Sequence, residues 1–487
     1  MAGSSRAAMP TSPGTWRSMA TDGSSRRHRG RSRPGPRPVT NVAVALDAKQ
    51  TWIAEFASSE PDLAGPAWLR PIRKQAIARF EAAGFPTQKH EDWRFTNLAP
   101  LLRVPFKPAI LGRPDGVVAE RLEPFSFGVL KTSRLVFVNG QFSPRLSYLR
   151  PLPEGVRVAS LAEILRNDPG SVEKDLARHA KYEDDAFVAL NTSFFTDGGY
   201  IEIPKGTVVE EPIHLVFVST SHEMPTVSHP RNVVRLGARS QATLIETYAG
   251  WAPDVTFTNA VTEISAGPGS VLDHYKIQRE SESAYHIATM TVDQDRDSNV
   301  MCHSMAFGAA LSRSYVHTNF HAEGGSVALN GLFMPSGVQQ ADNYTRIDHA
   351  APACTSVELY RGILGGKSRG VFNGNIYVRK DAQKTVARQT NKNLLLSKEA
   401  FVDSTPGLEI LADDVKCNHA STIGQLDENA IFYLRSRGID EEAARHILTY
   451  AFASDVVNQV KVAPIRIKLD QLILSRLPKG AGPGEGL

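Results

Sequence analysis

The chain has 487 residues, of which 41% are hydrophobic and 22% are charged, as is usual for soluble globular proteins. This composition excludes a wholly disordered, collagen-like or membrane-bundle protein. The sequence has no run of about 18 apolar residues, so no transmembrane helix is predicted. Residues 1–40 contain eight Arg and one acidic residue, whereas the rest of the chain contains 47 basic and 50 acidic residues. Nucleic-acid binding needs a basic folded face, so we expect neither nucleic acid nor a membrane as a partner.

Residues 1–40 are rich in Ser, Arg, Gly and Pro, and they carry too few apolar side chains to offset the entropy of ordering. They are predicted to be a disordered tail. Their composition is similar to that of an organelle transit peptide, but a tail without function is the simpler interpretation. Residues 41–125 are predicted to be an N-terminal helical region, with Trp52 and Phe56 at helical spacing and Gly84 at the end of the main helix.

Residues 126–422 have the texture of strands and turns, with short runs of Val, Ile, Thr and aromatic residues between Gly, Asn, Asp and Pro. Alternating apolar runs begin at intervals of 28 or 30 residues, at Ser240, Ser270, Ser298, Ser326, Ser356, Lys384 and Asp414. A near-constant step indicates units that stack on one another, as the coils of a β-solenoid do. A meandering antiparallel sandwich is the alternative, and the repeat favours the solenoid.

Residues 423–477 return to a helical pattern and predict a C-terminal helical domain, followed by a flexible end at 478–487. Asp427 and Asp440 are the expected N-caps of two helices. Pro464 is expected to stop the second helix. The apolar stripe of that helix is too wide for a free surface helix, so it should pack against the solenoid or a partner.

Two patterns that resemble ligand sites have simpler structural explanations. The loop at 362–368 lacks the first Gly of a phosphate-binding loop, because that position is Arg361. His317 and His321 would share a strand face about 13 Å apart, which is too far for one metal ion.

The cysteines have neither the spacing of a disulfide framework nor that of a tetrahedral zinc site. Cys417, however, stands two residues before His419 in the last repeat, so in a strand both side chains share one face. Thiolate and imidazole suit iron, zinc or copper, but two ligands do not complete a site. An ordinary Cys beside a surface His is equally compatible with the spacing. Because a solenoid ends in an open strand edge, a site here would be shared with a partner.

The sequence around this pair resembles a known family, the SufB/SufD scaffold subunits of iron–sulfur cluster assembly. The resemblance covers about residues 45–465. Its SufD branch is the more similar one, because of the HEDWRFT segment and the Lys-Cys-x-His stretch. The segments that carry the resemblance are Asp413–Gly438, HEDWRFT at 90–96, VFNGNIY at 371–377 and QTNKNLLL at 389–396.

The resemblance implies a mainly β fold, a right-handed parallel β-helix between an N-terminal helical region and a C-terminal helical domain. It implies a subunit that is not itself an enzyme, paired with SufB through the β-helix. A transient iron–sulfur cluster would form at the interface with SufB, where His419 is the implicated residue and tentative metal ligand, with Cys417 beside it. Sulfur-delivery proteins would act on the complex, and a reduced flavin would bind to it at a site that no motif locates.

The C-terminal helices are expected to dock a SufC-type ATPase. The residues expected to contact it are Tyr433, Leu434, Arg437, Leu448, Ala451 and Phe452. The expected location is the bacterial cytoplasm, or the plastid in a photosynthetic eukaryote. Three alternatives stay open: a purely structural pairing subunit without a ligand role, a SufB-type paralogue, and a polysaccharide-active β-helix enzyme. The last should carry an acid cluster on one solenoid face, which the sequence does not show.

Overall fold

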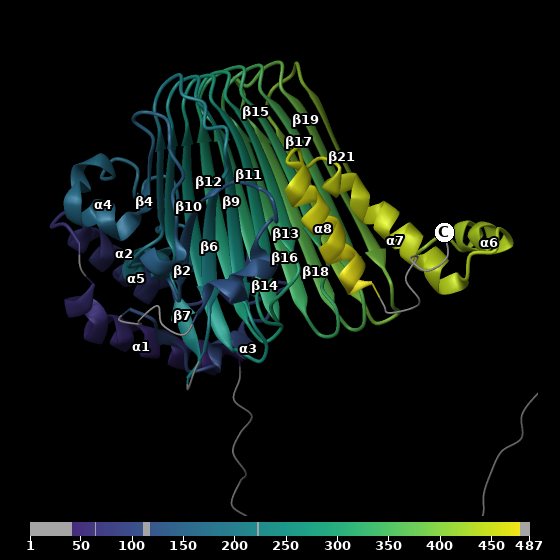
Figure 1. Ribbon diagram of the computed structural model, residues 1–487, viewed down its shortest axis with the longest axis horizontal. Helices are drawn as coiled ribbons and strands as arrows, with labels where there is room; N and C mark the ends of the chain where they lie inside the picture. The colour runs from purple at the N-terminus through teal and green to yellow at the C-terminus, as the bar shows by residue number, and fades with distance from the viewer. Residues whose placement is uncertain (1–40, 64, 111–116, 222–223, 478–487) are drawn as a thin grey trace, which may run out of the picture. The chain divides into compact units, whose positions relative to one another are not determined.

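The fold is known from a computed structural model that describes residues 41–63, 65–110, 117–221 and 224–477. The predicted tail at 1–40 and the predicted flexible end at 478–487 lie outside these residues. In the described chain, two sheets of mainly parallel strands face each other, and the chain passes from one to the other in each coil (Figure 1). The protein is therefore a parallel β-solenoid, as the repeat predicted.

We call the two sheets A and B. In order, sheet A runs β20-β18-β16-β14-β12-β10-β8-β5-β4, with β1 and β7 beside it, and sheet B runs β21-β19-β17-β15-β13-β11-β9-β6-β2-β3. The strands of sheet A are β1 (Lys107–Pro108), β4 (Arg157–Ser160), β5 (Gly199–Ile203), β7 (Thr226–Ser228), β8 (Arg231–Leu236), β10 (Thr256–Ala266), β12 (Tyr285–Gln294), β14 (Leu311–Phe320), β16 (Gln340–His349), β18 (Arg369–Val378) and β20 (Phe401–Ile410). The strands of sheet B are β2 (Ser133–Val138), β3 (Gln141–Phe142), β6 (Ile213–Ser219), β9 (Gln241–Gly250), β11 (Val271–Arg279), β13 (Asn299–Ala306), β15 (Ser326–Phe333), β17 (Thr355–Leu364), β19 (Val386–Leu395) and β21 (Lys416–Gly424).

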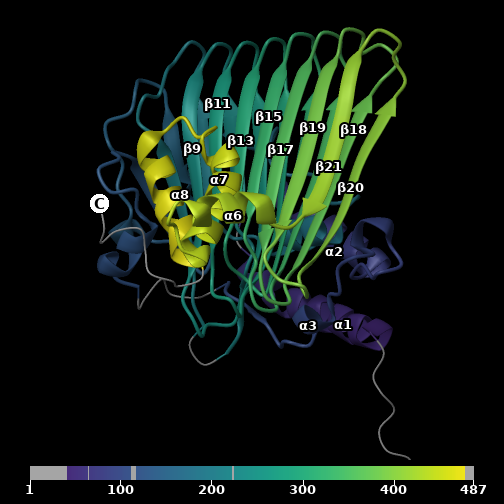
Figure 2. The same cartoon turned by 90° about the vertical axis from the view of Figure 1, so that its right-hand side faces the viewer.

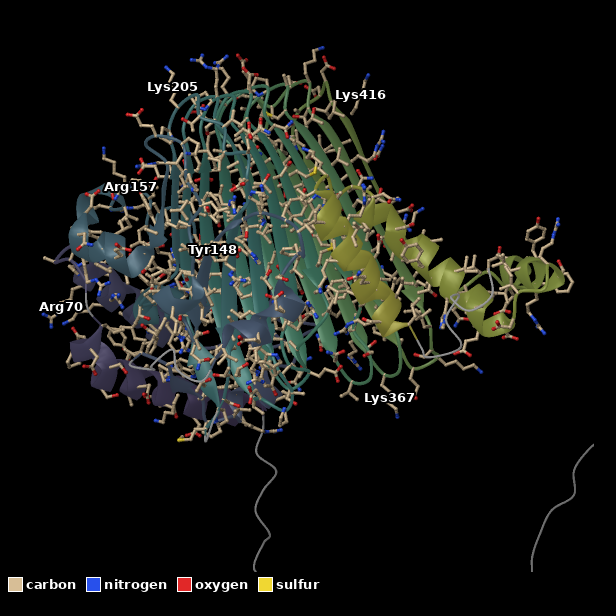
Figure 3. The ribbon with its side chains drawn as sticks, viewed as in Figure 1. Arg70, Tyr148, Arg157, Lys205, Lys367 and Lys416 are labelled. Atoms are coloured by element: carbon tan, nitrogen blue, oxygen red, sulfur yellow. The ribbon has the colours of Figure 1, made fainter. Side chains whose placement is uncertain are left out.

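The predicted repeat corresponds to sheet B. Each predicted start lies within two residues of the first residue of β9, β11, β13, β15, β17, β19 or β21. The turn before six of these strands contains a residue with a left-handed backbone, which reverses the chain direction in little space. These residues are Arg239, Gly269, Asp297, Gly324, Ala353 and Lys384. Charged side chains stand along both rims formed by the turns, such as Lys205 and Lys416 at one rim and Lys367 at the other (Figure 3).

Helices cover the outer faces of the two sheets, except α6, which stands away from the solenoid (Figure 1). The helices are α1 (Asn41–Ser59), α2 (Leu69–Ala83), α3 (Ala99–Leu102), α4 (Leu161–Asn167), α5 (Ala186–Phe194), α6 (Glu428–Ser436), α7 (Glu441–Val457) and α8 (Ala463–Arg476). The N-terminal helices and α5 pack aromatic residues such as Trp52 and Phe187 against Tyr315 of sheet A. Val456 of α7 and Leu469 of α8 belong to the apolar cluster on the outer face of sheet B (Figure 2). None of the described helices is long and apolar enough to span a membrane.

Several local predictions are confirmed. The carboxylates of Asp427 and Asp440 accept hydrogen bonds from backbone N–H groups at the starts of α6 and α7, both at 2.9 Å. Gly84, with φ of +69°, follows the end of α2. The phosphate-loop-like stretch at 362–368 is the end of β17 and the turn into β18, so it lacks the strand–loop–helix context of nucleotide binding.

Two features of the helices differ from the prediction. The range 126–422 contains α4 and α5 as well as strands, because these short helices are buried against sheet A and carry little periodic signal of their own. Pro464 does not stop the second C-terminal helix. That helix ends at Val457, and Pro464 lies in the first turn of α8, where a missing N–H is tolerated.

A buried carboxylate holds the N-terminal cover on the solenoid. We use this name for the N-terminal helices, α4, α5 and the loop before α5, which lie on the outer face of sheet A. Glu263 of β10 is fully buried, and it accepts hydrogen bonds at 2.8–3.1 Å from four consecutive backbone N–H groups, residues 177–180. It also forms an ion pair of 2.6 Å with Arg231, which is equally buried. The carboxylate therefore satisfies a loop and a buried guanidinium at the same time.

We predict that Glu263→Ala lowers the free energy of unfolding by roughly 3–5 kcal/mol, because Arg231 would be left buried and unpaired. Urea denaturation followed by circular dichroism measures this. Glu323→Ala is the matched control, since Glu323 forms an exposed ion pair with Arg296, and its loss should cost about 0–1 kcal/mol. Equal losses for the two variants would contradict the prediction.

Candidate functional site at the open end of the solenoid

The last coil leaves two strand edges open. Within the described chain, β21 pairs only with β19, and β20 pairs with β18 as the outermost strand of sheet A. Every residue of β21 from Asn418 to Gly424 is exposed. Large apolar side chains are exposed beside these edges, namely Phe401, Ile410, Leu411 and Ile423. Free backbone groups together with exposed apolar side chains make this end suited to a protein partner.

Cys417 and His419 both lie on β21, in register with Ala387 and Gln389 of β19. Ala387 and Gln389 are buried in the solenoid, so the two β21 residues face the interior side of the open end. Cys417 is half-buried and packs against the interior apolar cluster, whereas His419 is exposed. Burial raises the pKa of the Cys417 thiol, so its sulfur keeps its proton at neutral pH unless a metal displaces it.

The adjacent residues Cys302 and His303 have structural roles. Cys302 lies in the interior cluster, and its neighbour His303 points to the other face, where it stacks on Tyr275 with ring centroids 4.8 Å apart. No group of three or more His, Cys, Asp or Glu side chains in the described ranges could hold a metal ion. His419 and Cys417 would therefore need ligands from elsewhere to complete a metal site.

The interior directly below this end is polar. Gln389 donates a hydrogen bond of 2.7 Å to the carboxylate of Glu358, and both side chains are buried. Next to them, the hydroxyl of Ser404 lies 2.8 Å from the Asn391 side-chain oxygen and 2.8 Å from the hydroxyl of Ser421. Sequence reasoning missed this layer, because only the strand register shows that these polar residues face inward.

The residues expected to dock an ATPase divide into two groups. Tyr433 and Arg437 are exposed on α6, where the guanidinium lies 5.2 Å from the ring centroid, and Leu434 is half-buried beside them. On α7, Ala451 is exposed, Leu448 is half-buried, and Phe452 packs on Arg361 of the solenoid at 4.6 Å. Phe452 is thus a contact of the fold.

The most exposed apolar residue of α6 was not among the residues predicted to contact the ATPase. Phe432 is 72% exposed, and Ile431 is the one buried residue of this described helix. The sequence contained a signal for this exposure. Adjacent residues of a helix point in different directions, so a short helix cannot bury both Phe432 and Tyr433 against the same surface. Figure 1 shows α6 standing away from the solenoid, which agrees with the exposure of both side chains.

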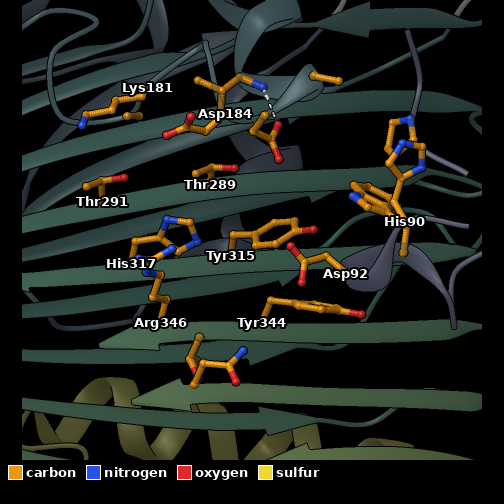
Figure 4. A pocket seen from close by; sticks show the side chains of 18 of the residues that line it. His90, Asp92, Lys181, Asp184, Thr289, Thr291, Tyr315, His317, Tyr344 and Arg346 are labelled. Carbon is orange, nitrogen blue, oxygen red and sulfur yellow. Dashed lines mark hydrogen bonds between the residues drawn. The ribbon is translucent and has the colours of Figure 1, made fainter. Parts of the chain in front are cut away.

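A large groove of about 1020 Å³ lies on the outer face of sheet A, against the N-terminal region (Figure 4). Tyr315, His317 and Tyr344 line its floor, and His90 and Asp92 from the HEDWRFT segment line its wall. Burial lowers the pKa of His317 to about 4, with a smaller contribution from the nearby positive charge of Arg346. The groove contains no residue of the open end.

Comparison with known proteins agrees with this architecture. Residues 217–452 match the SUF system FeS cluster assembly SufBD core domain, and residues 47–215 match the SufBD protein N-terminal region. The chain is 32% identical over 399 residues to an iron-sulfur cluster assembly SufBD family protein of Synechocystis sp., covering 80% of this chain and 87% of the relative. It is 31% identical over 413 residues to the iron-sulfur cluster assembly protein SufD of Escherichia coli, covering 84% and 94%. Identity to SufD of Bacillus subtilis is 24% over 444 residues, covering 89% and 98%.

The chain belongs to the SufBD family of iron–sulfur cluster assembly proteins. Within that family it is SufD-like, since relatives named SufD match nearly their full length.

Glu358 makes the stability of this end depend on pH. Burial raises the pKa of its carboxyl to about 7, so the folded chain keeps it protonated in acid and is destabilised as the pH rises from about 4.5 through 7. We predict that Glu358→Gln matches the wild type at pH about 5 and is more stable at pH about 8, by up to about 3 kcal/mol. Denaturation at both pH values tests this, with the exposed Glu409→Gln as control. An unchanged difference between the two pH values would contradict it.

Proposed function

We propose that this chain is a non-catalytic scaffold subunit whose open solenoid end forms half of a site for iron–sulfur cluster assembly. One observation carries the proposal: the terminal strand β21, which is paired along one edge only within the described chain, presents His419 to solvent beside exposed apolar residues. A SufB-type chain, with a solenoid of the same kind, is the partner proposed for this edge. Its β-helix would cover the apolar side chains and continue the strand pairing.

The chemistry of the two side chains fits a cluster that passes through as cargo. A neutral imidazole nitrogen of His419 can bind iron, while sulfide and side chains of the partner fill the remaining positions. Cys417 would join as a second ligand only if iron displaced its proton, so we propose it as the weaker of the two.

The C-terminal helices are the proposed docking surface for a SufC-type ATPase, with Phe432, Tyr433 and Arg437 of α6 at its centre. Aromatic and Arg side chains that stand exposed together are typical anchors of protein interfaces. Sulfur-delivery proteins would supply the complex, in the bacterial cytoplasm or in a plastid. The reduced flavin would belong to the assembled complex, and we assign no residue of this chain to it.

We predict that His419→Ala lowers the iron and sulfide content of the purified complex with its SufB-type and SufC-type partners at least about tenfold. Complex formation and ATPase activity should stay unchanged, because the His419 side chain is exposed and does not belong to the apolar core. Asn418→Ala is the control, since it changes an exposed residue of the same strand that points to the other face. Normal cluster content in His419→Ala would favour the second candidate function, a purely structural pairing subunit.

A separate prediction concerns the docking helix. Phe432→Asp should weaken binding of the SufC-type ATPase by at least about tenfold, because a charge would replace an interface aromatic. Binding of the purified ATPase to the full chain, measured by calorimetry, tests this. Val338→Asp is the matched control, as Val338 is an 84% exposed apolar residue of a solenoid turn. If the two variants bound the ATPase equally well, α6 would not be the docking surface.

A further inference from the structure

The interior row that ends at His419 has two polar members next to the open end, two apolar members behind them, and the buried His274 after those. The residues in register with His419 on successive strands of sheet B are Gln389, Glu358, Leu329 and Cys302. Leu329 and Cys302 belong to the apolar interior, whereas Gln389 and Glu358 are polar and no more than 1% exposed. Burying polar groups without full pairing costs stability, so this pair calls for a functional explanation.

The side chain of Gln389 is fixed in one place. Its Nε2 donates to Oε2 of Glu358 at 2.7 Å. On the facing strand, Gly374 leaves room for this amide, since a Cβ at that position would overlap the Gln389 Nε2. Gly374 and Gln389 belong to the VFNGNIY and QTNKNLLL segments, so both segments contribute to this arrangement.

The other end of the amide has no partner. Oε1 of Gln389 is buried and accepts no hydrogen bond from any described residue. A buried acceptor left unpaired costs about 1–3 kcal/mol, so a donor within reach of Oε1 is expected to pair with it. His419 is the next residue of the row, one strand spacing of about 4.8 Å away, and its ring makes no hydrogen bond within the described chain.

A neutral imidazole has one N–H donor and one lone-pair nitrogen. Histidines that bind metal commonly donate the N–H to a neighbouring oxygen, which fixes the tautomer and orients the other nitrogen towards the metal. Gln389 offers such an oxygen on the interior side of His419. Glu358 binds the amide nitrogen of Gln389, so the amide oxygen is the atom left to accept.

We propose that Gln389 is the positioning residue of His419: its side-chain oxygen accepts the imidazole N–H and so directs the other ring nitrogen to iron. Glu358 supports this contact by binding the amide nitrogen. The role of the second nitrogen rests on the proposed function, whereas the contact between Gln389 and His419 does not. The two claims can therefore be tested separately.

The contact is tested on the full chain without partners, by nitrogen-15 NMR of labelled histidine rings at pH about 8.5, where imidazole is neutral. His419→Ala identifies the signal of His419. In Gln389→Leu, which keeps the volume but removes the acceptor, the two ring tautomers should approach the mixture of a free imidazole. Gln389→Glu keeps an acceptor and should restore one predominant tautomer. Asn391→Leu is the matched control, because it removes an equally buried amide that is in register with Ser421.

The function of the contact is tested in the complex with its partners. Gln389→Leu should lower cluster content roughly 10–100-fold, and Gln389→Glu should recover most of it. An unchanged His419 tautomer in Gln389→Leu would overturn the proposal. If that variant failed to fold, a mixture of His419 tautomers in Gln389→Glu, which keeps the acceptor, would overturn it as well. A changed tautomer combined with normal cluster content in His419→Ala would leave the contact standing and reject only the proposed function.

Discussion

In-register parallel pairing between successive coils is the constraint on which the rest of this molecule depends. Each strand finds its hydrogen-bond partners only in the coil before and the coil after, so side chains line up in rows along the solenoid. The first coil is closed by the short antiparallel strands β3 and β4. The last coil has no such closure. The same rule that builds the core therefore leaves the final strand β21 with a neighbour on one side only, and that strand carries His419.

The segments that cover the outer faces of the two sheets are held by side-chain contacts rather than by strand pairing. On sheet A, Arg313 is buried between Trp93 and Tyr344, at 3.7 and 3.8 Å from their ring centroids, and it forms an ion pair with Asp342. Trp93 comes from the HEDWRFT segment, so the structure gives this segment a role in fastening the N-terminal cover. On sheet B, α7 and α8 are anchored by apolar contacts, and Lys461 binds Asp273 at 2.8 Å. Both covers leave the open end free.

Features that repeat along the chain, or that depend on the chemistry of neighbouring residues, could be predicted from the sequence. The coil step located sheet B, and Asp427 and Asp440 located two helix starts, because these signals are contained in neighbouring residues. The strands of sheet A, α4 and α5 were not located singly, since their side chains are buried on both faces or lack periodicity. Gln389 and Glu358 were missed for a related reason: a polar residue in a strand is read as outward-facing until its register is known.

The proposed site and the proposed docking surface are joined by very little chain. Only residues 425–427 separate the end of β21 from the start of α6, and three residues span at most about 11 Å. Leu426 packs against the apolar cluster under α7, which shortens the free link further. A partner bound to α6 thus acts on a segment directly continuous with the edge strand. Because β21 has one neighbour rather than two, fewer hydrogen bonds resist its displacement than hold the long strands inside sheet B, and the imidazole of His419 would move with it.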